Sequence, residues 1–380
     1  MTIVDRYLLA QFLKIFLVCL VSFAGLFVVI HVFTNLDEVV TLAGQEGGMQ
    51  NLLIAFYGPR VLDFFNRMAG ILVLVSAVFA ISMMQRRREA TATEAAGITK
   101  ARLVVPIIVA AMVIIGLAAV CRELYIPQYR SALVRSLTNW TSNGSVVMHH
   151  QKDVETGILV QGNKLFVDQA KITEVQVTLP RHLGSEIIDI QAGLGFVQNE
   201  IPEKNVPNGL LLKKNIEPSN LIRSPSIQWE GKTIVYTPKD FGWLRSDEVF
   251  VVCSLDVQEM AYGENLYLYS SLPEMIDSLK KPSRRFGLGD QVAIHDRILK
   301  PLMEFTLLLI GLPLVVSNPN RNIFMGAALC ALIIILMQVT TVASHAAGGL
   351  RMIQPASLAA WLPVIVFLPL SAFSLRKLFD

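Results

Sequence analysis

Six long apolar segments constrain the fold of this chain more than any other feature. A helix needs about 20 mainly apolar residues to cross roughly 30 Å of hydrocarbon. Each segment must be helical, because an open strand would leave its backbone N–H and C=O groups unpaired in lipid. The segments are residues 15–33, 68–84, 103–121, 298–316, 323–343 and 352–375. They predict six membrane spans in a three-plus-three arrangement.

The composition leads to the same class of protein. Of the 380 residues, 53% are hydrophobic and only 17% are charged, which is too apolar for an ordinary soluble domain of this size. The net charge of +3 is small and forms no basic stripe, so nucleic-acid binding is excluded. Residues 22–24 resemble a signal-peptide cleavage site, but the apolar run continues to Phe33, so we expect an uncleaved first span.

Basic residues near the span ends predict the orientation. All four basic sets fall on one side of the predicted spans, and the positive-inside rule assigns that side to the cytoplasm. The sets are Arg6 with Lys14, Arg86 to Arg88 with Lys100 and Arg102, Arg321, and Arg376 with Lys377. The connection between spans one and two carries Asp37, Glu38 and Glu46 instead. It is expected outside, together with the large block 122–293.

The outer block has the pattern of a β domain. Two apolar runs, 157–160 and 164–168, flank Gln161-Gly162-Asn163, which predicts a hairpin turn. A second hairpin is predicted within 227–236, around Glu230-Gly231-Lys232, and 249–255 is a further apolar strand. About 170 residues suffice for one β domain with its own core.

The loop between the second and third predicted spans contains a helix pattern of its own. The apolar run ends in three arginines, 86–88, followed by Glu89, an alanine-rich stretch and Gly97, before Lys100 and Arg102. Glu89 in a first turn suits the positive end of the helix dipole. Gly97 would end the helix as a left-handed C′ residue. A short cytoplasmic helix between two spans is therefore predicted.

Further motifs occur in a fixed order along the chain. They are Arg88-Glu89 and Ala95-Ala96-Gly97-Ile98-Thr99 after span two, His295-Asp296-Arg297 and Pro301-Leu302 at span four, Gly311-Leu312-Pro313-Leu314, Gly348-Gly349-Leu350, Pro355, and Trp361-Leu362-Pro363. In this order, with a β block between two sets of three spans, the chain resembles the YjgP/YjgQ permeases, LptF and LptG of the lipopolysaccharide exporter. The resemblance covers essentially the whole chain.

The resemblance implies a fold class and a location. The fold is that of an α-helical membrane protein with six transmembrane helices (3+3) and an inserted periplasmic all-β, jellyroll-like domain. Residues 1–126 would hold helices one to three with a cytoplasmic coupling helix at about 86–98, residues 127–293 the β domain, and residues 294–380 helices four to six. The location implied is the inner membrane of a Gram-negative bacterium.

The resemblance also implies a function and partners. The chain would be a permease subunit of an ABC transporter, not an enzyme, paired with a paralogous permease subunit as a heterodimer. The other implied partners are a cytoplasmic LptB-type ATPase dimer that uses ATP and Mg²⁺, an LptC-like periplasmic bridge protein, and lipopolysaccharide itself. This chain has no G-x-x-x-x-G-K-[ST] segment to cradle nucleotide phosphates, so we expect it to bind no cofactor and to need a separate ATPase.

Family members use a glutamate eight residues before a glycine as the coupling acid that meets the ATPase. That spacing selects Glu89 before Gly97, with Ala95 on the same helix. For the arginines 86–88, the simpler interpretation is a solvated hairpin that sets the orientation of the chain. Whether the chain is the F-like or the G-like subunit stays open.

Charged residues near the outer ends of the spans allow two interpretations. Arg60, Asp63 and Arg67 share one helix face near the start of span two. They form either a self-compensating cluster or a site in which one guanidinium holds an anion such as a lipid A phosphate. His31 and His345 lie at the outward ends of spans one and five, which line the lipid cavity in the family, although a lone interfacial histidine is also a common polar anchor.

Two further predictions concern span four and the β domain. Arg297, Lys300 and Glu304 fall on one face of span four, where internal pairing is favoured over substrate contact. The inward positions of the β strands would form a hydrophobic groove for lipid. The candidate groove residues are Ile158, Val160, Leu165 and Val167. Which parity of the strands faces inward is left open.

Other classes of function fit the sequence less well. It contains no nucleophile elbow or zinc motif, and His149-His150 lacks ligand spacing, so catalysis and metal binding are disfavoured. A proton-driven lipid transporter would need ionisable residues at the bilayer midplane, where these spans are nearly charge-free. An envelope scaffold that displays the β domain is the other alternative. The coupling-type loop helix counts against both.

Overall fold

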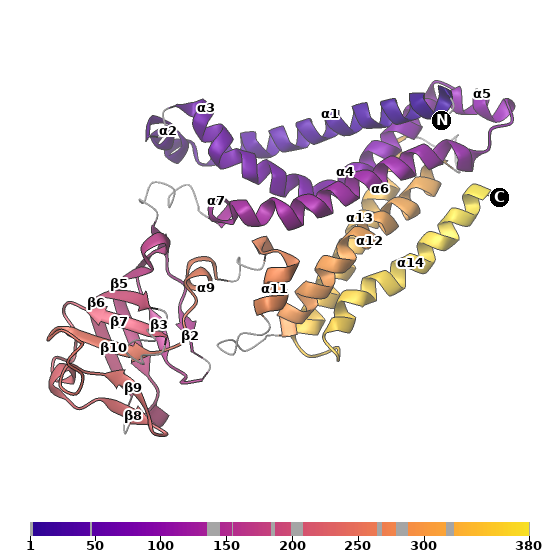
Figure 1. The fold of residues 1–380 in the computed structure, drawn as a ribbon. Helices are drawn as coiled ribbons and strands as arrows, with labels where there is room; N and C mark the ends of the chain where they lie inside the picture. The colour runs from indigo at the N-terminus through magenta and orange to yellow at the C-terminus, as the bar shows by residue number, and fades with distance from the viewer. Residues whose placement is uncertain are drawn as a thin grey trace.

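The structure is a computed structural model in which the helical part and the β part of the chain form separate regions (Figure 1). It describes residues 3–45, 48–134, 145–153, 155–183, 187–198, 208–263, 268–278, 288–316 and 323–379. Glu46 and Arg321, two charges used above to predict orientation, lie outside these residues.

The described residues include six helices that are long and apolar enough to span a membrane, as the sequence predicts. They are α1 (Ile3–Thr34), α4 (Gly58–Arg86), α6 (Lys100–Leu124), α12 (Leu288–Val316), α13 (Ile323–Gly349) and α14 (Ser357–Phe379). Both chain ends and the loop between α4 and α6 lie at the same end of the bundle (Figure 1). Three helices precede the β strands and three follow them, which confirms the three-plus-three arrangement.

Four of the helices begin several residues away from the predicted starts, and two of these are α4, at Gly58 instead of residue 68, and α12, at Leu288 instead of residue 298. The first helix begins at Ile3 instead of residue 15, because its polar start carries Leu8 and Phe12, which pack in the core with 1% and 0% exposure. The last helix begins at Ser357 instead of residue 352. Residues before it form turns, in which Arg351 has a left-handed φ of 62°.

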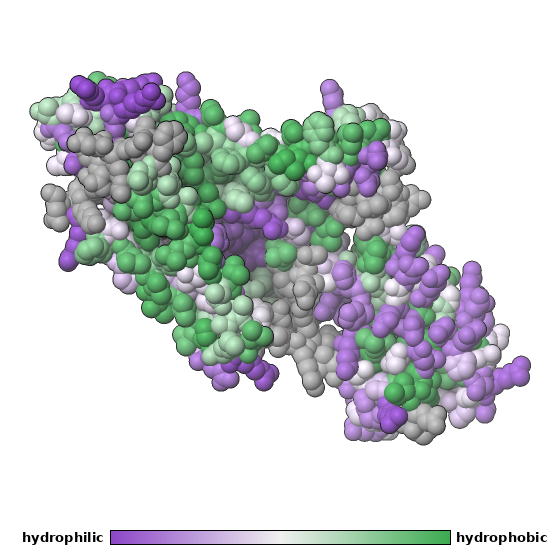
Figure 2. Space-filling model, turned by 180° about the vertical axis from the view of Figure 1, so that it is seen from behind, coloured by the Kyte–Doolittle hydropathy of each residue, from purple (hydrophilic) through white to green (hydrophobic). Residues whose placement is uncertain are grey.

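The helix α4 is the centre of the membrane bundle. It packs against α1, α6, α12 and α13. In its most apolar window 67% of the residues are buried, whereas the corresponding values are 11% for α1 and 17% for α13. These two helices therefore present most of their apolar surface outward, and Figure 2 shows broad hydrophobic areas over the helical region.

The connection between α1 and α4 is itself helical. It contains α2 (Leu36–Gln45), α3 (Met49–Leu52) and a π-helical turn (Leu53–Tyr57). Val39, Leu42, Leu52, Phe56 and Tyr57 form a small buried core there. Pro59 at the start of α4 fits the first turn, where its missing N–H has no helical partner.

The β region is one antiparallel sheet in the described part of the chain. Its strands are β1 (Ser145–Val147), β2 (Gln151–Lys152), β3 (Leu159–Gln161), β4 (Lys164–Phe166), β5 (Lys171–Leu179), β6 (Ile188–Gln198), β7 (Gly209–Lys213), β8 (Ile227–Trp229), β9 (Lys232–Tyr236) and β10 (Glu248–Val252). The order is β1-β4-β5-β6-β7-β10-β9-β8, and β3 pairs with β2 and β5. The short helix α9 (Val257–Tyr262) packs on the core of the sheet, whereas α7 (Arg130–Val134) and α11 (Leu272–Ser278) lie against the helical bundle (Figure 1).

The predicted hairpin around Gly162 is wrong. Strands β3 and β4 both pair with β5 in one continuous register, from Leu159 opposite Thr178 to Phe166 opposite Lys171. Gly162 is present because a Cβ there would collide with Ile172 and Met148, so it marks close packing and not a turn.

The second predicted hairpin is confirmed. Trp229 pairs with Lys232, and Glu230 and Gly231 between them have φ values of 49° and 78°. Two successive left-handed residues form the type of two-residue turn that matches the twist of antiparallel strands. The predicted apolar strand near residue 250 is also present as β10.

Candidate functional site

The short helix in the loop between α4 and α6 is the first candidate site. Helix α5 (Glu89–Ala95) has no fully buried residue, and although Ala90 packs against the membrane helices, Thr91, Ala92, Glu94 and Ala95 are exposed and open to a partner. Glu89 lies in its first turn, as the sequence predicts, and Ala95 is its last residue. Both chain ends lie at this same end of the bundle (Figure 1).

Gly97 ends α5 in the way that the sequence predicts. Its φ is 78°, and its N–H donates to Glu94 O at 2.9 Å, while Ile98 N donates to Thr93 O at 3.1 Å. These two hydrogen bonds form a Schellman motif. Ile98 also packs with Leu8 and Met84, which fixes the end of α5 on the membrane helices.

Glu89 has a partner that the sequence analysis missed. The Tyr7 hydroxyl, from the first turns of α1, lies 3.2 and 3.1 Å from the two Glu89 carboxylate oxygens and can donate to either. Arg87 Nη1 lies 3.9 Å from Glu89 Oε1 and 3.5 Å from the Tyr7 hydroxyl. Glu89 is therefore oriented by α1 as well as by its own helix. No local signal could have indicated this contact, because 82 residues separate Tyr7 from Glu89.

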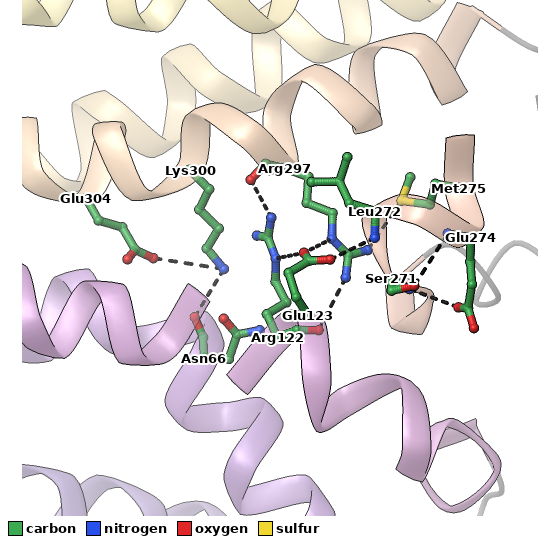
Figure 3. Close-up of polar contacts among 10 residues, drawn as sticks. All are labelled: Asn66, Arg122, Glu123, Ser271, Leu272, Glu274, Met275, Arg297, Lys300 and Glu304. Atoms are coloured by element: carbon green, nitrogen blue, oxygen red, sulfur yellow. Dashed lines mark hydrogen bonds and ion pairs between the residues drawn. The ribbon is translucent and has the colours of Figure 1, made fainter. Parts of the chain in front are cut away.

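A second candidate site lies where α6, α11 and α12 meet (Figure 3). Arg297 Nε donates to Glu123 Oε1 at 2.8 Å, and Leu272 N donates to Glu123 Oε2 at 2.7 Å. The Arg297 side chain is only 6% exposed and also approaches Met275 Sδ at 3.3 Å. One carboxylate thus joins the ends of two spans to the first turn of α11.

Arg122 completes this junction. Its guanidinium donates to the backbone oxygen of Arg297, and its Nε lies 3.6 Å from Glu123 Oε1. The Arg122 side chain is 12% exposed. Buried guanidinium groups need such partners, because an unpaired charge in a low-dielectric environment is costly. Arg122 and Glu123 were not identified from the sequence, because their partners are on a helix about 175 residues later.

Lys300 and Glu304 continue the polar surface along α12. Lys300 Nζ donates to Asn66 O at 3.1 Å and lies 4.0 Å from Glu304 Oε1. Lys300 and Glu304 therefore pair on this face as the favoured interpretation predicts, whereas Arg297 pairs with Glu123 on α6. Figure 2 shows a hydrophilic hollow between apolar parts of the helical region, where lipid-facing surface would otherwise be expected.

The structure brings His31 and Arg60 together around one aromatic ring. Arg60 Cζ lies 3.3 Å from the centre of the Phe56 ring, and the His31 ring centre lies 6.0 Å from it. Arg60 Nη1 donates to Phe56 O at 2.8 Å, and His31 Nδ1 lies 3.0 Å from the Tyr57 hydroxyl. His31 lies in the last turn of α1 and Arg60 in the first turn of α4, on either side of the helical connection.

Arg67 and His345 have different surroundings. Arg67 Nε donates to Asp63 Oδ2 at 2.8 Å, and its Nη2 donates to the Tyr269 hydroxyl at 3.3 Å. His345 Nε2, on α13, lies 3.3 Å from Asp296 Oδ1 on α12. These are the contacts of the two side chains in the absence of a lipid. The roles of Arg67 and His345 toward a lipid stay predictions.

The candidate groove residues lie in the core of the β domain. Ile158, Val160 and Leu165 each have 0% exposure, and Val167 packs partly buried against the same cluster. The intervening Gln161 is exposed. The structure thus shows which side chains of these strands face inward, a point that the sequence left open. A lipid would contact these side chains only if the core opens.

Comparison with known protein families gives a match over most of the chain. The model of the lipopolysaccharide export system permease LptF/LptG family matches residues 6–177 and 254–377, which include all six membrane helices. No individual curated protein matches the chain. Among the described residues, no group of three or more His, Cys, Asp or Glu side chains is placed to hold a metal ion. With three of the matched helices before the antiparallel β domain in the sequence and three after it, the chain belongs to the LptF/LptG family of lipopolysaccharide export permeases.

Proposed function

We propose that this chain is one of two permease subunits of an ATP-driven exporter in the inner membrane of a Gram-negative bacterium. The pair extracts lipopolysaccharide from the membrane and passes it to an LptC-like periplasmic bridge protein. A separate LptB-type ATPase dimer hydrolyses ATP with Mg²⁺ on the cytoplasmic side. The β domain lies in the periplasm.

The observation that carries this proposal is the exposed helix α5. It is held at both ends, at Glu89 by the Tyr7 hydroxyl and after Gly97 by the packed side chain of Ile98. A short helix fixed to three membrane helices moves with them, so a force applied to α5 reaches α1, α4 and α6. Such an attachment is what a chain without its own nucleotide site requires.

The outward apolar faces of α1 and α13 support the paralogous permease partner. Only 11% and 17% of the residues in their most apolar windows are buried. A cavity closed by two such subunits would hold the acyl chains, while His31, Arg60, Arg67 and His345 would lie at its outer end near the phosphates. Arginine suits this role because its planar guanidinium binds phosphate oxygens in pairs.

The β domain provides the next shielded environment. Each methylene exposed to water costs about 0.8 kcal/mol, so an acyl chain that leaves the bilayer needs continuous apolar contact. The inward side chains Ile158, Val160 and Leu165 would supply it when the core opens.

The proposal is tested by purifying the full chain from cells with its associated proteins and measuring the ATPase that accompanies it. We expect Glu89→Ala to lose most of the copurifying ATPase and lipopolysaccharide export. The protein should remain inserted, because a substitution on a helix surface rarely changes stability by more than about 0.5 kcal/mol.

A matched control is available on the same helix. Glu94 lies 4.0 Å from Lys100, and its side chain is 40% exposed, compared with 33% for Glu89. Glu94→Ala should retain the ATPase. Normal export and normal ATPase recovery in Glu89→Ala would contradict the proposal, and the absence of any nucleotide-binding partner would favour the scaffold alternative.

A further inference from the structure

A second feature near α5 is a groove between α1 and α4. The groove encloses about 460 Å³ and opens along the side of α1. Along α1 the groove is lined first by the polar side chains of Tyr7, Gln11 and Lys14 and then by the apolar side chains of Ile15 and Val18, while α4 contributes Met83 and Arg87. The groove thus changes from polar to apolar along the helix axis, as an amphiphile does.

The polar end offers donors and positive charge. Arg87 is 52% exposed, and its Nη1 lies 3.5 Å from the Tyr7 hydroxyl. Lys14 lies two helical turns after Tyr7, on the same face of α1. Two cations and a hydroxyl around one opening are complementary to a phosphodiester group.

Gln11 supplies an independent observation. Its side chain lines the groove between Tyr7 and Lys14, and within the described part of the chain neither its Nε2 nor its Oε1 has a hydrogen-bond partner, although both atoms are buried. A buried amide without a partner carries a desolvation cost, and a turn of the Gln11 side chain toward the groove would let a ligand with polar head atoms remove that cost. The amide can donate to a phosphate or ester oxygen and accept from a headgroup hydroxyl.

The apolar end of the groove is long enough and exposed enough to hold an acyl chain. The side chains of Val18 and Met83 are 60% and 41% exposed. Gln11, Ile15 and Val18 follow one face of α1 at spacings of four and three residues, so the face continues from the amide into the hydrocarbon.

We propose that this groove binds an anionic glycerophospholipid from the leaflet on the α5 side, with its phosphate between Lys14 and Arg87 and one acyl chain along Ile15, Val18 and Met83. The bound phosphate competes with the Glu89 carboxylate for Arg87 and the Tyr7 hydroxyl. Lipid occupancy therefore changes how firmly Glu89 is held on α1. This regulatory step, unlike binding itself, rests on the proposed coupling role of Glu89.

Binding is tested with the full chain in detergent, supplied with equal amounts of phosphatidylglycerol and phosphatidylcholine of the same acyl length. Native mass spectrometry then counts each lipid retained. We expect a preference for phosphatidylglycerol that falls about five-fold in Arg87→Gln and in Lys14→Gln, because one basic residue near a membrane surface contributes about that factor. Glu89→Gln should raise the preference by removing the competing carboxylate.

Arg86→Gln is the matched control. It removes the same charge from the neighbouring position, but Arg86 does not line the groove. Unchanged preference in Arg86→Gln supports the site. An equal fall in Arg86→Gln and Arg87→Gln would show general attraction to the basic loop and overturn it, as would the absence of any preference in the unmodified chain.

A photo-reactive residue at Val18 identifies the occupant in cells. A phospholipid adduct supports the proposal, whereas capture of a protein helix would overturn it. Neither readout requires ATPase binding or export, so failure of this site and failure of the proposed function give different results.

Discussion

Glu123 and Arg297 show how single residues connect distant parts of this chain. One carboxylate accepts from the Arg297 side chain and from the backbone of Leu272, which is 149 positions after Glu123. Replacing both members of a buried pair with apolar groups can be neutral, but removing one member leaves an uncompensated charge. These residues therefore fix the junction between α6, α11 and α12.

We expect Glu123→Gln to destabilise the protein by about 2 kcal/mol, since it removes the charge from the hydrogen bond to Arg297 and such charge-assisted bonds contribute about 1.5–3 kcal/mol. The measurement is the thermal unfolding midpoint in detergent. Glu274→Gln is the control, because the Glu274 side chain is 47% exposed and lies 3.7 Å from Arg130 at the surface. Exposed pairs contribute about 0–1 kcal/mol. Equal shifts in the two variants would contradict the importance of the buried pair.

Residue positions were predictable where the reason is local. Gly97 and Gly231 were identified correctly because a helix end and a two-residue turn each require a left-handed residue at a known offset. Gly162 was misinterpreted because its reason is a contact with Ile172, on another strand. The Glu123 to Arg297 pair could not be found from spacing, since it depends on how two spans pack.

At the scale of elements, the close contact between α4 and α12 depends on glycine. A Cβ on Gly70 would lie 2.7 Å from Glu304 Cγ and 3.3 Å from its Cα, and a Cβ on Gly311 would lie 2.5 Å from Leu74 Cδ1. Small residues let membrane helices approach each other and increase van der Waals contact. This contact keeps Lys300 and Glu304 beside Asn66.

Gly70→Ala should therefore destabilise the bundle by about 1–3 kcal/mol, because overpacking forces the Glu304 backbone to move. Gly116→Ala, in the middle of α6, is the control, since nothing lies within 4 Å of a Cβ there. Thermal unfolding in one detergent compares the two. A Gly70→Ala protein as stable as Gly116→Ala would rule out close packing at this position.

At the scale of the whole molecule, hydropathy predicted the number and order of the spans because that signal is strong and regular. It did not give the exact ends of α1 and α14, which depend on packing of Leu8 and on the turns before Ser357. The pairing of β7 with β10 was also beyond the sequence, since it joins strands that are not consecutive. The jellyroll-like character of the β domain stays a prediction.

The proposed orientation leads to a labelling experiment in cells with a permeabilised outer membrane. Ser219→Cys, in the β domain, should react with an impermeant thiol reagent, whereas Ala92→Cys on α5 should react only after lysis. Native Cys253 gives no background, because it is 2% exposed and burial raises the pKa of its thiol, so little reactive thiolate forms. Reaction of Ala92→Cys in unlysed cells would contradict the proposed cytoplasmic location of α5.

The proposed passage of lipopolysaccharide through this chain is tested most directly by photo-crosslinking at residues 158–161, which include β3, in cells that export normally. Photo-reactive residues at Ile158 and Val160, which face the core, should capture lipopolysaccharide, and those at Leu159 and Gln161 should not, because alternate side chains of a strand face opposite ways. Capture should disappear when ATP is depleted. If none of these positions captures the lipid during normal export, lipopolysaccharide does not pass through this β domain.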